Sequence, residues 1–191
     1  HDTSLKIHEV ILKYCSELGL SFCGNIKVID SDYNCYKLKL KEDIYYYFLA
    51  SINDFTYPRN RFSIIISENK NLEESEEFIL LVCSQDFEAL LPNLKMTRSQ
   101  IDNFKNTINS VKEQGMQSMV YAFKTISKEE FENFNKKKLN LDIGKYDGDQ
   151  NQFNELYDSI EQELEIVLIL NIKEALKIGA YENIAAFKDA K

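Results

Sequence analysis

The sequence is poor in several residue types. Its 191 residues include six glycines, two prolines, two histidines and three arginines. Its apolar runs, such as Ile166 to Leu170, are far shorter than the roughly 20 residues that span a bilayer. The start of the chain has no apolar signal core, so we expect no direct membrane insertion by this segment. The few cysteines, Cys15, Cys23, Cys35 and Cys83, contain no Cys-x-x-Cys pair, which favours reduced thiols in a cytosolic setting over a zinc site.

What is present indicates a folded domain. The composition is 44% hydrophobic, 12% aromatic and 28% charged, which excludes disorder as the main state. A chain of this length buries about 70% of its unfolded surface, so it needs neither a disulfide nor a metal to fold. The net charge of -8 and the scattered basic residues argue against a nucleic-acid partner.

The spacing of apolar residues predicts both helices and strands. Helices are expected at Leu5–Leu18, Thr97–Gln114, Ser127–Lys138, Phe153–Leu164 and from Tyr181 onward, with Ser127 and Glu130 forming a capping box and Gly115 ending the second helix. Strands are expected at Phe22–Ile29, Cys35–Leu40, Ile44–Ile52, Phe62–Ile66, Phe78–Val82, Met116–Phe123 and Ile166–Leu170. The order predicts an α+β domain with a mainly antiparallel sheet, flanked by helices.

The polar stretches between these runs are expected to be loops. The acidic run Glu73–Glu77 is interpreted as a solvated hairpin loop, and Asn140–Gln152 as a loop or a disordered excursion. Asp147 and Asp149 flank a glycine without the rest of a calcium loop, so a turn is the simpler interpretation. For His8, in the first predicted helix, a structural role is favoured over a chemical one.

The segment from residue 53 to residue 66 is the most informative for function. Phe55 precedes Pro58 at the edge of a predicted strand pair, beside two of the three arginines, Arg59 and Arg61. An aromatic ring in that place could stack on a base while the guanidinium groups hold phosphate. By composition alone, a place in the hydrophobic core is the favoured interpretation of Phe55.

This segment resembles the nucleotide-binding domain of P-type ATPases of the phospholipid-flippase branch, whose pattern here is E-F-x-S-x-R-K-R-M-S-V-I. The matching residues are Phe55, Arg59, Arg61, Ser63 and Ile64. Five further blocks also resemble the family, and all of the blocks stand in the family's order along the chain. These five are Val10–Phe22, Tyr47–Phe55, Gly115–Glu130, Ile160–Leu164 and Ile172–Ile184. The resemblance implies that residues 1–171 form the nucleotide-binding unit and that residues 172–191 return toward the phosphorylation domain.

In that family the domain belongs to a multi-pass membrane protein, lies on its cytosolic face, and works with phosphorylation and actuator domains. The resemblance therefore implies those partner domains, with Mg²⁺ supplied only through the parent protein. The aspartate motif D-K-T-G-T is absent, so this chain is not catalytic by itself. Cationic family positions are replaced by Asn60, Cys83 and Gln117, whereas the stacking Phe55 remains. Because each charged hydrogen bond is worth roughly 1.5–3 kcal/mol, we expect ATP binding to be very weak.

Two functions are compatible with this pattern. The first is a regulatory or scaffolding domain with an eroded ATP pocket, similar to the flippase-like ATPase region that some protist guanylyl cyclases carry ahead of their cyclase domains. The alternative is the ATP-binding domain of an active phospholipid-translocating ATPase. The nucleotide-binding positions would be Phe55, Arg59, Asn60, Arg61, Cys83 and Gln117 in either case, with no catalytic residue and no metal ligand.

Overall fold

The computed structural model describes residues 15–17, 20–27, 34–68, 72–143 and 150–173. Its centre is a seven-stranded antiparallel sheet in which the strand order in space is the order in sequence. The strands are β1 Leu20–Lys27, β2 Asn34–Leu40, β3 Asp43–Thr56, β4 Arg61–Ser67, β5 Glu77–Ser84, β6 Met116–Ser127 and β7 Glu165–Lys173. The predicted α+β class and the mainly antiparallel sheet are confirmed, and the expected strand runs overlap these strands; the last two residues of the run Phe22–Ile29 lie outside the described residues.

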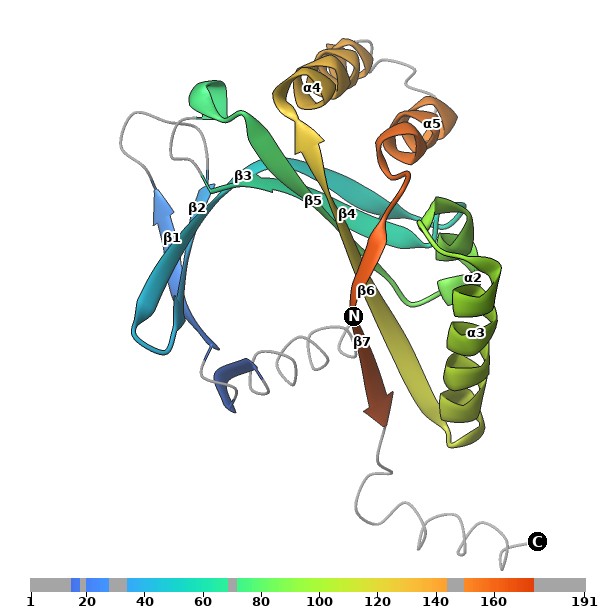
Figure 1. The fold of residues 1–191 in the computed structure, drawn as a ribbon. Coiled ribbons are helices and arrows are strands. Elements are labelled where there is room, and N and C mark those ends of the chain that lie inside the picture. The colour runs from blue at the N-terminus through green and yellow to red at the C-terminus, as the bar shows by residue number, and fades with distance from the viewer. Residues whose placement is uncertain (1–14, 18–19, 28–33, 69–71, 144–149, 174–191) are drawn as a thin grey trace, which may run out of the picture.

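The four α-helices that follow β5 lie on one side of the sheet. They are α2 Phe87–Leu90, α3 Arg98–Glu113, α4 Lys128–Ile143 and α5 Gln150–Ile160, with short 3-10 helices η1 Leu72–Glu74 and η2 Leu91–Asn93. The sheet curls, and α2 to α5 line its outer, convex side (Figure 1). The acidic run Glu73–Glu77 begins in η1 and ends at the first residue of β5.

Local capping explains where the two longest helices begin. The side chain of Thr97 accepts a hydrogen bond from the backbone N–H of Gln100, and the Gln100 side chain accepts one from the backbone N–H of Thr97. This capping box marks the start of α3. Gly115, at φ +71°, ends the turn after that helix, as its sequence position predicted. The Ser127 hydroxyl accepts from the N–H of Glu130 at 3.2 Å, as expected for the start of α4.

The core fills the space between the convex face of the sheet and the helices. Alternate residues of the central strands point into it, because successive strand side chains face opposite sides. Leu80 and Val82 from β5 and Val120 and Ala122 from β6 are almost completely buried there, under apolar side chains of α3, α4 and α5.

Two predicted boundaries near α5 are wrong. The helix ends at Ile160 and not at Leu164. Leu164 instead pairs with Leu94, just after η2, donating its N–H to the Asn93 carbonyl at 2.8 Å and accepting from the Lys95 N–H at 2.8 Å. The predicted loop 140–152 is also shorter than expected, because α4 continues to Ile143 and α5 begins at Gln150.

Several expectations concern residues outside those that the structure describes. Of the predicted helix Leu5–Leu18, only residues 15–17 are described, and they are helical. His8, Asp147 and Asp149 lie outside the described residues, as does the expected helix from Tyr181 onward. Ile172 and Lys173, at the start of the expected return segment, belong to β7.

Candidate functional site

Phe55 lies at an irregular point of β3. The pairing of β3 with β4 shifts between Asn53 and Thr56, and such a bulge redirects the side chains of the strand. The Phe55 side chain is 53% exposed, and the Tyr57 ring contacts it edge-on at 5.8 Å between centroids. The interpretation of Phe55 as a core residue is therefore wrong, and its ring remains accessible for stacking.

Arg59 and Arg61, in contrast, are buried in a charged cluster. Both guanidinium groups donate to Glu161, Arg59 through Nη2 and Arg61 through Nε at 2.6 Å. Arg61 also donates to Asp158, and the Ser63 hydroxyl donates to Glu161 at 2.5 Å. We call these five residues the Glu161 cluster. Its two guanidinium and two carboxylate groups balance in charge.

The local structure explains why these side chains meet. Arg61 and Ser63 are alternate residues of β4, so they share the sheet face that α5 covers. On the other side, Asp158 lies in the last turn of α5 and Glu161 just after its end, three residues on. The Asn93 side-chain amide donates to the Glu161 carbonyl at 2.7 Å, which fixes the backbone at that point.

The burial of the Glu161 cluster determines what its arginines can do. Arg59 is 2% exposed and Glu161 0%, and the Arg59 guanidinium also lies 4.7 Å from the centre of the Tyr157 ring. Removing one partner from a buried ion pair costs about 3–5 kcal/mol, because the other charge is then left uncompensated. Arg59 and Arg61, which were expected to hold phosphate, are held inside the protein by carboxylates. Their position indicates a structural role.

Asn60 occupies the tight turn between these arginines. Its φ is +50°, a conformation that asparagine tolerates better than most residues. Its side-chain amide lies 3.4 Å from an Asp86 carboxylate oxygen, and its carbonyl accepts from the Ser84 hydroxyl at 2.7 Å. Asp86 in turn caps α2. Asn60 therefore joins the β3–β4 turn to the segment after β5.

Cys83 and Gln117 lie on the face of the sheet opposite the Glu161 cluster. Cys83 is paired with Phe62 on one side and Tyr121 on the other, so its side chain alternates with the buried Val82 and Ser84. Burial raises the pKa of the Cys83 thiol and of the Tyr121 phenol, with which it interacts. Gln117 shares the face of Tyr121 but lies four residues, about 13 Å, along β6. The structure does not gather the six predicted residues around one pocket.

A cavity of about 380 Å³ lies beside Phe55, between the end of β3 and the helices α4 and α5. The side chains of Lys138, Asp142 and Tyr157 line it together with Asp54. The Lys138 ammonium lies 5.4 Å from the centre of the Tyr157 ring. This combination of an exposed aromatic ring, carboxylates and an ammonium group is the most chemically varied of the described hollows.

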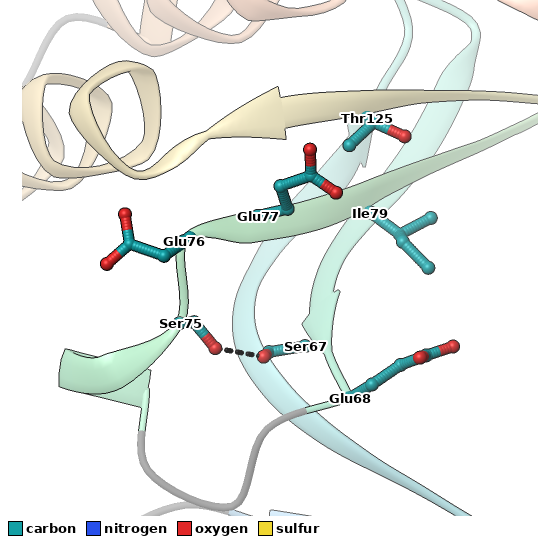
Figure 2. Close-up of a pocket in the computed structure, with 7 residues that line it drawn as sticks. All are labelled: Ser67, Glu68, Ser75, Glu76, Glu77, Ile79 and Thr125. Atoms are coloured by element: carbon teal, nitrogen blue, oxygen red, sulfur yellow. Dashed lines mark hydrogen bonds between the residues drawn. The ribbon is translucent and has the colours of Figure 1, made fainter.

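A second hollow, of about 290 Å³, lies at the β4–β5 connection. Figure 2 shows its acidic side chains, Glu68, Glu76 and Glu77, pointing in different directions, while the hydroxyls of Ser67 and Ser75 share a hydrogen bond. Carboxylates that do not converge cannot share one cation. Across the residues that the structure describes, no group of three or more His, Cys, Asp or Glu side chains is placed to hold a metal ion.

Comparison with known proteins identifies no family for this chain. No protein-family model and no curated protein matches the sequence. In the described part of the chain, no helix combines the length and the apolar character that crossing a membrane requires.

Sequence reasoning did not identify three residues on which the site depends. Glu161 and Asp158 are two of 31 acidic residues, and nothing in the local pattern marks them as partners of arginines about 100 residues earlier. Lys138 reads as one of three consecutive lysines on a solvated helix face. Two arginines separated by one residue, Arg59 in the turn and Arg61 at the start of β4, are the local signal that a buried acidic partner is needed.

Proposed function

We propose that this chain is the nucleotide-binding-type domain of a phospholipid-flippase-like P-type ATPase region with an eroded ATP pocket. In this proposal it has a regulatory or scaffolding role within a larger membrane protein such as a guanylyl cyclase. Its partners would be the phosphorylation and actuator domains of that parent chain. The segment itself neither transports nor hydrolyses.

One observation carries the proposal: the aromatic ring is exposed whereas the arginines beside it are buried. Phe55 remains available to stack on a base, but the Glu161 cluster engages both Arg59 and Arg61. Stacking on one base supplies only about 1–3 kcal/mol, less than the roughly 4 kcal/mol of a millimolar affinity. A site of this kind holds ATP weakly, as a regulatory domain would.

The Glu161 cluster also supports the family resemblance from which the proposal starts. The R-x-R-x-S segment at Arg59 and the I-E-x-x-L segment at Ile160 are two of the six resembling blocks. They come together across about 100 residues in buried ion pairs. The alternative, an ATP-binding domain of an active flippase, is favoured only by the exposed ring of Phe55.

An ATP titration followed by chemical-shift changes tests the proposal. We expect the natural sequence to bind no more tightly than about 1 mM. The variant Cys83→Lys/Gln117→Arg should bind more tightly, because it returns two of the cations that the resembling family carries at these positions. The matched control, Asn106→Lys/Asn109→Arg, adds the same charge on exposed positions of α3 and should show no gain. Micromolar binding by the natural sequence would overturn the proposal in favour of the active ATPase.

A further inference from the structure

The strand β7 is the last of the sheet, and its outer edge is open across the residues that the structure describes. It pairs with β6 on one side, and no other described strand lies next to it. An edge strand presents unpaired backbone N–H and C=O groups, which can pair with another extended chain. The strand β7 therefore offers a row of hydrogen-bonding groups that its pairing with β6 does not use.

The sequence of β7 has little of what normally blocks an open edge. Natural proteins protect such edges with charged side chains, proline or a bulge. One bulge is present, at Val167, where the register with β6 shifts and the side chain is 60% exposed. The five residues after it, 168–172, contain no charge and no proline and pair regularly with β6. We call these five residues the β7 edge segment.

The β7 edge segment carries aliphatic side chains on both faces of the sheet. Ile169 pairs with the buried Val120 and packs against the core. Because strand side chains alternate between faces, Leu168, Leu170 and Ile172 lie on the opposite, concave face. Leu168 is 46% exposed. An exposed aliphatic side chain beside an open strand edge favours burial by a partner that extends the sheet.

The charges of β7 are arranged so that the strand complements itself. Its only ionisable side chains are Glu165 at the start and Lys173 at the end. Two copies of the strand in antiparallel order bring the negative end of each to the positive end of the other, whereas a parallel order brings like charges together. Antiparallel pairing is also the direction of every strand pair in the sheet. The charge pattern therefore favours a second copy of this chain as the partner.

We propose that two copies of this chain associate through their β7 edge segments, as a two-fold symmetric antiparallel strand pair centred on Leu170. This register uses all five residues of the segment and leaves the bulge outside the pair. Leu168 then lies opposite Ile172 of the second copy, and Leu170 lies opposite its own counterpart, so the concave face gains a row of aliphatic contacts. The inference goes beyond the proposed function and does not depend on ATP binding.

Sedimentation and hydrogen exchange of the whole chain, measured at concentrations up to about 1 mM, test the inference. We expect the mean mass to rise with concentration and the amides of the β7 edge segment to become more protected in parallel. A mass that stays that of one chain at every concentration contradicts the inference. Protection of the segment that does not change with concentration also contradicts it, because the chain would then cover its own edge.

Substitutions on the two-fold axis identify the surface and the register. Leu170→Lys and Leu170→Glu each place like charges opposite one another, so each variant alone should dimerise less than the natural chain, whereas an equimolar mixture should form a mixed dimer. Leu168→Lys, at a more exposed position, should weaken dimerisation by roughly 2- to 30-fold, because two symmetric cross-strand pairs are lost. If a Leu170 variant does not fold, the result for Leu168→Lys decides.

The matched control is Ile44→Lys, which adds the same charge at a site that is 48% exposed on β3. It should leave dimerisation unchanged. Dimers that persist unchanged in the Leu168 and Leu170 variants would place the contact on another surface and overturn the inference. Loss of dimers in Ile44→Lys as well would show that added charge alone prevents association, and would overturn it too.

Discussion

Near the β3–β4 turn, the two faces of the sheet differ in the charged side chains that they carry. On the convex face, the Glu161 cluster places two guanidinium groups against two carboxylates, with Arg59 and Glu161 almost completely buried. On the opposite face, Cys83 and Tyr121 interact with each other, and burial raises the pKa of both groups. Residues only one position apart along β4 and β5 thus belong to opposite electrostatic environments.

This difference between the two faces shows why a sequence motif alone does not reveal which of its arginines can contact a ligand. A strand alternates its side chains between its two faces, so adjacent residues of a motif do not share one site. The family-like segment therefore supplies an exposed ring at Phe55 and, separately, a pair of structural cations. Of these groups, the ring is exposed and the two guanidinium groups are buried.

Removing the central carboxylate should produce the largest effect. Glu161→Ala leaves two buried guanidinium groups with one carboxylate, and we expect a loss of about 3–5 kcal/mol in the free energy of unfolding. Urea denaturation measures it. The control Glu163→Ala removes a carboxylate two residues later, at an exposed position, and should cost far less. Equal losses in the two variants would mean that the cluster contributes little.

The next effect concerns the edge of β3. Lys138→Met keeps the length of the side chain but leaves the acceptors at Ser51, Ile52 and Asn53 without this donor, and should destabilise the domain by about 1–3 kcal/mol. Lys137→Met, at the neighbouring exposed position, is the matched control. Thermal unfolding distinguishes them, and identical midpoints would contradict the assigned contacts.

A smaller effect is expected in the turn between β3 and β4. Asn60 has φ +50°, so Asn60→Ala should cost about 1 kcal/mol, whereas Asn60→Gly should be close to neutral. Denaturant midpoints of the two variants provide the comparison. A glycine variant as unstable as the alanine variant would show that the contact with Asp86 matters more than the backbone conformation.

The smallest effect appears only in alkaline solution. Because burial raises the pKa of Cys83 and of Tyr121, the unfolded chain loses these protons more easily than the folded one. Their contribution to stability is complete below pH about 9 and should be lost as the pH rises through the folded values. Tyr121→Phe should reduce this alkaline slope in denaturation curves measured across that range. An unchanged slope would exclude Tyr121 as a source.

The sequence was sufficient for the strands but not for the site. Runs such as Phe78–Val82 and Phe62–Ile66 combine β-branched and aromatic residues between polar breaks, so local preference and final structure agree. The end of α5 was misjudged because Glu161 suits a helix locally, whereas its ion pairs and the Asn93 contact determine its actual conformation. Tertiary contacts overrode propensity at that point.

The roles of Arg59 and Lys138 could not be predicted for a related reason. Each depends on partners far away in the chain, Glu161 for the first and the edge of β3 for the second. The chain offers 31 acidic residues, and no local rule selects among them. The exposure of Phe55 depends on a bulge, which the alternation of residues around it does not reveal.

The order of the strands also has a kinetic consequence. Every strand pairs with its immediate neighbours in sequence, so most of the sheet can form by adding one hairpin at a time. The Glu161 cluster is the exception, because it joins residues about 100 positions apart and closes a long loop. We expect it to form after the folding transition state. Glu161→Ala would then accelerate unfolding while leaving the folding rate nearly unchanged.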